Sequence, residues 1–176
     1  MKRIMAVKPA SAESRTITKH YFSVRDEIRK VFGVSTMGVV VQQGNTMAPR
    51  TILIVEDDKE IAAVLEALLF EEFGANIILA QTGREASQIV RTQPIDLILL
   101  DYHLPDTNGL QLYDSWRCYS SLRDTPIIMT SANPPYEELE KRHLMNITKP
   151  FDLEDILQAV QHGLTARQRT ARHRVY

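Results

Sequence analysis

The sequence predicts an α/β fold in which helices cover a doubly wound, five-stranded parallel sheet. Two observations lead to this fold class. Short apolar runs recur along the chain, and between them lie stretches whose apolar residues follow helical spacing. Strands that alternate with helices in this way form parallel sheets with right-handed crossovers. The run 95–100 is apolar apart from Asp96, which is typical of a central strand buried on both faces.

Each predicted strand is a short apolar run bounded by charged or turn-forming residues. None of these runs is long enough to cross a bilayer. The predicted strands cover residues 52–55, 77–80, 95–101, 126–131 and 144–148.

The first two predicted helices have clear start and stop signals. Apolar residues at i, i+3, i+4, i+7 and i+8 positions from Ile61 to Leu69 predict a core-facing helix, which Gly74 ends. Thr82 and Glu85 have the spacing of a capping box, so we expect a second helix to begin there.

The remaining helices follow the third, fourth and fifth strands. We expect one helix over about 108–119, and a short polar helical stretch that Pro134 and Pro135 open. A last helix is expected from a cap at Asp152 to Gly163, which closes it.

Composition indicates one domain with extensions. The chain has 176 residues, of which 44% are hydrophobic and 24% are charged, and its formal net charge is −1. Residues 1–49 form a predominantly basic N-terminal extension with one possible helix over 23–32. The domain is expected over 50–165, and residues 166–176 read as a basic, solvated C-terminal tail.

The sequence also indicates a compartment. A single cysteine excludes an internal disulfide and fits a reducing environment. The basic start lacks the apolar core of a signal peptide, and no window is apolar enough for a membrane span. We therefore predict a cytoplasmic protein without a membrane partner.

Polar side chains follow the ends of four predicted strands. In a parallel sheet the carboxyl ends of the strands lie along one edge, where ligands bind in open α/β folds. We therefore expect these side chains to converge at that edge. They are Glu56 and Asp57 after the first strand, Asp101 at the end of the third, Ser131 at the end of the fourth, and Lys149 after the fifth.

Such a cluster indicates chemistry with phosphoryl groups. Two carboxylates about 4 Å apart repel by roughly 4 kcal/mol at an effective dielectric near 20, so the cluster needs a cation, and hard oxygen ligands suit Mg²⁺. With the charge neutralised, Asp101 can act as a carboxylate nucleophile toward a phosphoryl group that Lys149 and Ser131 hold. Taken singly, the same residues have simpler interpretations as helix caps, a turn residue and a solvated lysine.

Residues 51 to about 163 resemble the receiver domain of two-component response regulators. The matching motifs are IVEDD at 54–58, LLD at 99–101 followed by LP at 104–105 and Gly109, PIIMTSA at 126–132, and TKPF at 148–151. The resemblance implies a flavodoxin-like receiver fold in which Asp101 accepts a phosphoryl group. The donor would be a sensor histidine kinase or a histidine phosphotransfer protein.

The same resemblance implies roles for the site residues. Mg²⁺ would be bound by Asp57, Asp101 and the backbone carbonyl of His103, with Glu56 assisting through water. Ser131 and Lys149 would engage the phosphoryl group and trigger a change in shape.

Two departures from the family pattern concern the output. The segment between Ser131 and Lys149 is a few residues shorter than usual, and Asn146 stands where the family often has a switching Tyr or Phe. We therefore expect activation to shift a loop or short helix over 134–143 without an aromatic switch.

Three functions compete. The leading hypothesis is a stand-alone receiver, not an enzyme, that works in a phosphorelay and signals through phosphorylation-dependent interaction with an unknown downstream protein. The alternative is a small aspartyl-phosphate phosphatase or phosphotransferase, but such enzymes usually need a second acid two residues after the nucleophile, where this chain has His103. A nucleic-acid partner is not expected, because the tail arginines have no recognition helix beside them.

Overall fold

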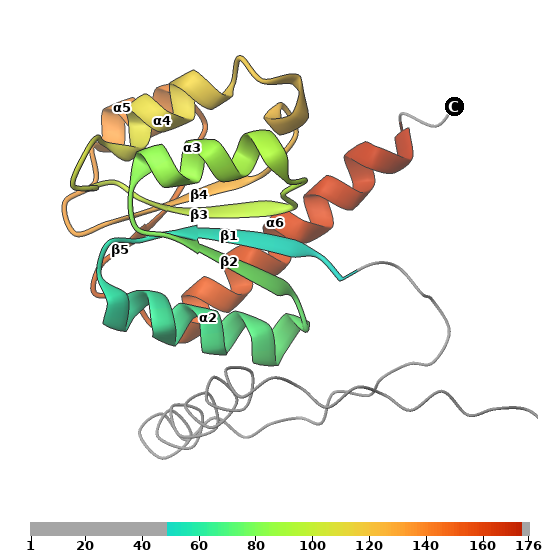
Figure 1. Cartoon of the computed structure of the whole chain (residues 1–176), viewed down its shortest axis with the longest axis horizontal. Coiled ribbons are helices and arrows are strands. Elements are labelled where there is room, and N and C mark those ends of the chain that lie inside the picture. Colours follow the sequence, from blue (N-terminus) through green and yellow to red (C-terminus); the bar gives the residue numbers. More distant parts are fainter. Residues whose placement is uncertain (1–48, 174–176) are drawn as a thin grey trace, which may run out of the picture. The chain divides into compact units, whose positions relative to one another are not determined.

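The computed structural model describes residues 49–173, with side chains to residue 167 (Figure 1). The extension before residue 49, including the helix expected over 23–32, lies outside the described residues. The described strands form one five-stranded, all-parallel sheet in the order β2-β1-β3-β4-β5. This confirms the predicted flavodoxin-like fold class. The strands are β1 Thr51–Val55, β2 Asn76–Ala80, β3 Leu97–Asp101, β4 Ile127–Ser131 and β5 Met145–Thr148.

Helices cover both faces of the sheet (Figure 1). Within the described chain, no helix is long and apolar enough to serve as a membrane span. The first face is covered by α3 (Gly83–Thr92), α4 (Gly109–Trp116) and α5 (Tyr136–Lys141), and the second by α2 (Lys59–Phe73) and α6 (Leu153–His173).

The central strands face two hydrophobic cores, which explains why their sequences are uniformly apolar. On β3, Ile98 and Leu100 pack with α3, α4 and α5, whereas Leu97 and Leu99 pack with α2 and α6. All five residues of β3 are buried. The strand therefore ends with Asp101 still inside the fold, and the chain turns away only after this carboxylate.

The predicted caps of the first helices are confirmed. Gly74 ends α2 with a φ of 57°, a left-handed conformation that favours glycine. Thr82 caps α3 by accepting a hydrogen bond from the Glu85 amide. The helix after β3 ends at Trp116, earlier than the predicted residue 119, because the chain continues into a 3₁₀ turn over Ser120–Leu122.

The expected helix end at Gly163 is wrong. Helix α6 passes through Gly163 and continues to His173. A Cβ atom on Gly163 would lie 2.8 Å from Leu97 Cδ1 and 3.3 Å from Pro126 Cβ. The glycine is therefore explained by the close approach of α6 to β3, and not by termination of the helix.

The expectation of a solvated tail is also wrong for its first arginine. Arg167 donates hydrogen bonds to the Ile95 carbonyl and, at 2.8 Å, to Thr125 Oγ1. Its Nε lies 3.5 Å from Asp96 Oδ1, and Asp96 Oδ2 accepts from the Thr51 amide at 2.9 Å. Arg167 thus joins α6 to the amino-terminal edge of the sheet. The division of the chain into an extension, a domain and a tail stays a prediction.

Gly163→Ala tests the packing explanation. If Gly163 occupied a free helix surface, alanine would stabilise the chain because its helix propensity is higher. The fully buried Leu97 cannot yield readily, so we expect the substitution to lower the free energy of unfolding by about 1–3 kcal/mol. Urea unfolding measures the change, with the exposed Gln161→Ala on the same helix as the control. A more stable Gly163→Ala protein would contradict this account.

Candidate functional site

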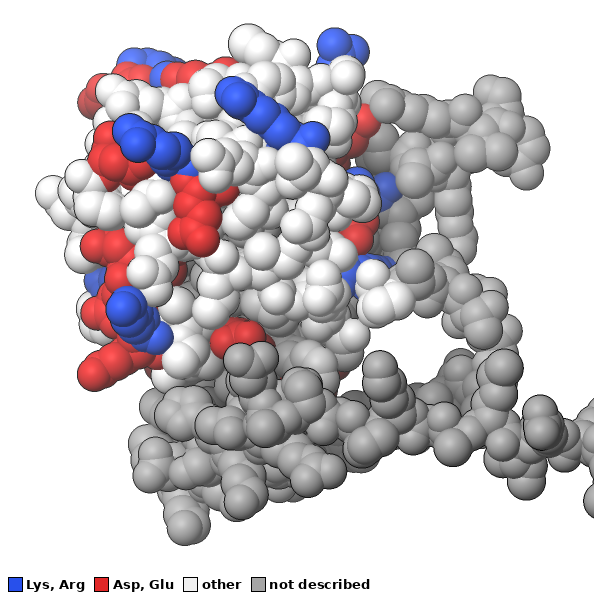
Figure 2. Space-filling view, viewed as in Figure 1, with Lys and Arg blue, Asp and Glu red and all other residues white. Residues whose placement is uncertain are grey.

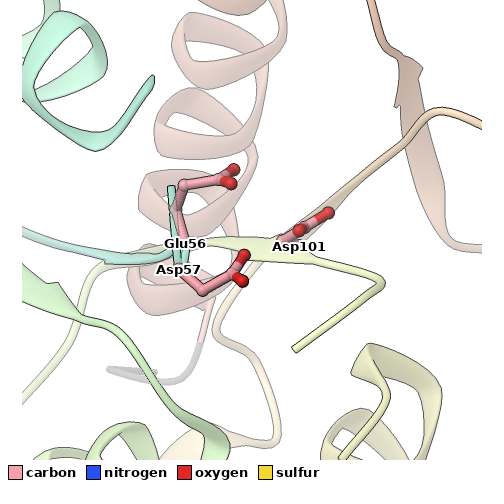
Figure 3. A group of neighbouring side chains, drawn as sticks. All are labelled: Glu56, Asp57 and Asp101. Atoms are coloured by element: carbon pink, nitrogen blue, oxygen red, sulfur yellow. The ribbon is translucent and has the colours of Figure 1, made fainter. Parts of the chain in front are cut away.

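Three carboxylates meet at the carboxyl edge of the sheet. Each of Glu56, Asp57 and Asp101 offers one oxygen, and these oxygens all lie within 4.8 Å of one another. Figure 3 shows the three side chains gathered around a common space. On the face drawn in Figure 2, Asp and Glu side chains lie with Lys and Arg among them, most densely toward the left of the view. The convergence expected from the strand ends is therefore present.

The backbone explains the different exposure of these carboxylates. The Glu56 amide donates to the Ala80 carbonyl at 3.0 Å, which extends the pairing of β1 with β2 and keeps the side chain 3% exposed. Asp101 is still paired with Thr130 of β4 and is 5% exposed. Asp57 has left the sheet and is exposed. Asp58 continues the chain as the cap of α2, accepting from the Glu60 and Ile61 amides.

Lys149 reaches the two buried carboxylates from the end of β5. Its Nζ lies 2.7 Å from Glu56 Oε2 and 3.2 Å from Asp101 Oδ1. The Lys149 amide donates to the Ser131 carbonyl at 2.8 Å, so β4 fixes the position from which the side chain extends. The single ammonium of Lys149 is shared between Glu56 and Asp101, so the three neighbouring carboxylates of the cluster are left short of positive charge.

The electrostatics of the cluster are set by burial. Desolvation raises the pKa of Glu56 and that of Asp101, although Lys149 opposes the change in both. Burial alone would lower the pKa of Lys149, but the hydrogen bond that its ammonium donates to Glu56 and the charge of Asp101 outweigh this effect, so the pKa of the lysine is raised. Several closely spaced carboxylate oxygens with a deficit of positive charge fit a hard divalent cation such as Mg²⁺.

Ser131 lies at the end of β4 and is fully buried. Its Oγ accepts a hydrogen bond from the Asn133 amide at 3.2 Å, which links it to the segment leading into α5. The structure thus places Glu56, Asp57, Asp101, Ser131 and Lys149 at one edge of the sheet, as the strand ends predict.

His103 lies in the loop that leaves β3. This loop, 102–108, is closed by an antiparallel bridge between His103 and Asn108, and the Gly109 amide donates to the Tyr102 carbonyl at 2.8 Å. A Cβ on Gly109 would lie 2.7 Å from both the Asp101 carbonyl oxygen and Met129 Sδ, so only glycine permits this return of the chain. The role of the His103 carbonyl as a metal ligand stays a prediction.

Sequence reasoning missed Asp106. Its two carboxylate oxygens accept from the Gly83 amide at 2.8 Å and from the Arg84 amide at 2.9 Å, so the loop after Asp101 is bound to the start of α3. Nothing local marks this contact, because the partners are 23 and 22 residues apart. The one available signal was an acidic residue in a loop at the edge where helix N-termini gather.

Asn146 lies on β5, and its side-chain amide has few hydrogen-bond partners among the described residues. Its Nδ2 lies 3.4 Å from Thr148 Oγ1, which is also 3.4 Å from the hydroxyl of the exposed Tyr136 at the start of α5. Asn146 Oδ1 is buried and has no hydrogen-bond partner among the described residues. The side-chain amide of Asn146, which stands where an aromatic ring is common in the family, therefore has only part of its hydrogen-bonding capacity satisfied.

Comparisons with known proteins identify relatives of this fold and site. The family profile for the response regulator receiver domain matches residues 52–161. The transcriptional regulatory protein DltR of Streptococcus agalactiae is 33% identical over 114 residues, which are 62% of this chain and 50% of DltR. The chain thus spans about half the length of the curated relatives it matches.

Solved structures agree with this match. A putative response regulator from Chloroflexus aurantiacus aligns with a TM-score of 0.61 and 27% identity, covering 66% of this chain and 98% of that one. The receiver domain of sensor histidine kinase PA1611 from Pseudomonas aeruginosa, with a magnesium ion coordinated in the active site cleft, aligns with a TM-score of 0.59 and 29% identity. That alignment covers 67% of this chain and 99% of the other.

Proposed function

This chain belongs to the response regulator receiver domain family, and we propose that Asp101 is its phosphoacceptor. Receiver domains are signalling modules that take phosphoryl groups from histidine kinases. The observation that carries the proposal is the position of Asp101, buried at the end of the central strand, within 3.2 Å of Lys149 Nζ and in one cluster with two further carboxylates.

The proposed reaction transfers a phosphoryl group from a phosphohistidine. A carboxylate oxygen of Asp101 forms the new bond to phosphorus while the P–N bond of the donor breaks, and the electron pair of that bond returns to the imidazole nitrogen. The product is an acyl phosphate on Asp101 and a free histidine on the donor. A sensor histidine kinase or a histidine phosphotransfer protein would supply the group.

The residues present fit the Mg²⁺ that receiver domains bind in their acidic site. Glu56, Asp57 and Asp101, together with the backbone carbonyl of His103, would hold the ion. When bound, it neutralises the carboxylates and the charge that develops on the phosphoryl oxygens.

Lys149 and Ser131 would receive the phosphoryl group. Lys149 already lies between Glu56 and Asp101, so its ammonium can bind a phosphoryl oxygen with little movement. The Ser131 hydroxyl can donate to another oxygen. Because this hydroxyl also accepts from the Asn133 amide, its movement would change the start of the segment that carries α5.

We propose that the output is a phosphorylation-dependent interaction of the region 134–143 with a downstream protein. Helix α5 is held to α4 by Arg142, whose Nε and Nη2 each lie 2.9 Å from an oxygen of Asp114. The aspartyl-phosphate phosphatase is not favoured, since the position two residues after Asp101 carries the exposed His103 instead of an acid. A cytoplasmic location stays a prediction.

Labelling with phosphoramidate, a small P–N donor, tests the proposal. We expect one acyl phosphate per chain, formed with Mg²⁺ and not with EDTA, and assigned to Asp101 by peptide mass spectrometry. If inorganic phosphate is released much faster than the protein becomes labelled, the result would instead favour the phosphatase. Label on another residue would exclude Asp101 as the phosphoacceptor.

Ser131→Ala should separate phosphorylation from output. The variant keeps the carboxylates and Lys149, so we expect labelling of Asp101 to persist. Amide exchange with and without a beryllofluoride phosphate mimic should change over 133–143 in the wild type and much less in Ser131→Ala, because the hydroxyl that links the two regions is gone. Asn146→Ala is the control and should respond like the wild type. Changes confined to α6 would show that the signal leaves by another route.

A further inference from the structure

The loop 102–108 is joined to α3 by a contact that the proposed chemistry does not use. This loop follows Asp101 directly and contains His103. Its ends are fixed near the sheet, where the Tyr102 amide donates to the Thr130 carbonyl at 2.9 Å and the Gly109 amide returns to the Tyr102 carbonyl. Its tip is a tight turn in which the Leu104 amide donates to the Thr107 carbonyl at 3.2 Å.

Asp106 binds the tip of this loop to the first turn of α3. One carboxylate oxygen accepts from the Gly83 amide and the other from the Arg84 amide. These are two of the amides that have no partner within the helix, and the positive end of the helix dipole favours an anion there. Bonds to a charged acceptor are stronger than neutral ones, and two of them fix direction as well as distance.

Packing supports the same contact. A Cβ atom on Gly83 would collide with Thr107 Cγ2 and lie 2.9 Å from Leu112 Cδ1. The absence of a side chain at Gly83 therefore lets the loop tip lie directly on the start of α3. The Thr107 hydroxyl bonds to Gln111 Oε1 at 3.0 Å, so the tip is also tied to α4.

We propose that Asp106 is a positioning residue of the phosphoacceptor site. By anchoring the loop to α3, it holds the chain segment containing His103 in a fixed place beside Asp101. The proposal rests on the function proposed above, since it assigns Asp106 to the same metal-binding edge. Asp106 is exposed and contacts the backbone of α3, so it acts through the loop and not on the phosphoryl group.

The simpler interpretation is that Asp106 only caps α3. The chain offers a matched control for this, because Thr82 caps the same helix turn by accepting from the Glu85 amide and has no bond to the loop. Loss of either cap should weaken the helix by a similar amount. Only loss of Asp106 should change metal binding.

The experiment compares Asp106→Ala, Asp106→Asn and Thr82→Ala in the full chain. Mg²⁺ affinity is measured by isothermal titration calorimetry, and labelling by phosphoramidate is measured as a function of Mg²⁺ concentration. We expect Asp106→Ala to weaken Mg²⁺ binding by about 10-fold, as is typical when a group that orients a ligand is removed. Thr82→Ala should bind Mg²⁺ like the wild type.

Asp106→Asn is the conservative variant, which should restore part of the Mg²⁺ affinity that Asp106→Ala loses. Its amide oxygen can accept from one of the two amides without the charge, so its Mg²⁺ affinity should lie between those of the wild type and Asp106→Ala. Labelling of Asp106→Ala should recover at high Mg²⁺, because the nucleophile is intact. If Asp106→Ala does not fold, the comparison of Asp106→Asn with Thr82→Ala decides.

Equal Mg²⁺ affinity in the Asp106 variants and Thr82→Ala would overturn the positioning role. This outcome differs from failure of the proposed function, which would appear as a wild-type chain that gains no label on Asp101. Calorimetry needs no phosphorylation, so it tests the position of the loop in either case.

Discussion

Asp101→Asn is expected to abolish phosphorylation. The amide is a poor nucleophile, and it places no negative charge where a bound cation and Lys149 need one. The fold should survive, because removing a buried carboxylate from a cluster of three relieves repulsion. Incubation with phosphoramidate and Mg²⁺, followed by intact mass measurement, should give labelled wild type and no labelled variant.

Asp58→Asn is the matched control for this substitution. It makes the same chemical change one residue beyond Asp57, and asparagine caps a helix as well as aspartate does, so α2 should keep its start. We expect near wild-type labelling. Full acyl-phosphate formation on Asp101→Asn, or equal loss in both variants, would remove Asp101 from its assigned role.

Lys149→Met is expected to have the largest effect on stability. Methionine keeps most of the apolar stem but removes the ammonium group that lies between Glu56 and Asp101, whose side chains are 3% and 7% exposed. Breaking a buried ion pair on one side costs about 3–5 kcal/mol, since the remaining charges are left without compensation. Urea unfolding in EDTA at neutral pH measures this loss.

The pH dependence of this loss has a definite sign. Burial holds the pKa of Glu56 and that of Asp101 above their ordinary values, and the charge of Asp101 adds to the rise at Glu56. Lys149 opposes the rise in both, so both pKa values should be higher without the lysine. A carboxyl whose pKa is raised by folding stabilises the fold most when protonated and loses that contribution as the pH rises through the raised pKa. The loss in free energy of unfolding of Lys149→Met relative to the wild type should therefore be small in acid and grow toward neutral pH.

Added Mg²⁺ should narrow the deficit of Lys149→Met, because a bound cation replaces the missing positive charge. Lys141→Met is the control, since Lys141 pairs with Glu138 at 2.6 Å but both side chains are largely exposed. That pair should contribute little. A Lys149→Met deficit that is the same at all pH values and Mg²⁺ concentrations would show that the lysine acts by packing and not by charge.

The sheet and the acidic cluster could be predicted from the sequence because both depend on local patterns. A strand buried on two faces must be apolar at every position, and β3 shows this until Asp101. Parallel strands then bring their carboxyl ends to one edge without further information. Glu56, Asp57, Asp101, Ser131 and Lys149 therefore lie where the strand ends placed them.

Contacts between distant segments were decided only by the tertiary structure. Glycine commonly ends a helix, yet Gly163 lies inside α6, because the helix must approach Leu97 closely at this residue. Arg167 looks like a solvated charge, yet the Ile95 carbonyl, Thr125 and Asp96 surround its guanidinium. Asp106 binds amides more than twenty residues away. Local spacing determines which residues form strands and helices, whereas a close approach or a long-range hydrogen bond depends on how those elements pack, and no local pattern encodes it.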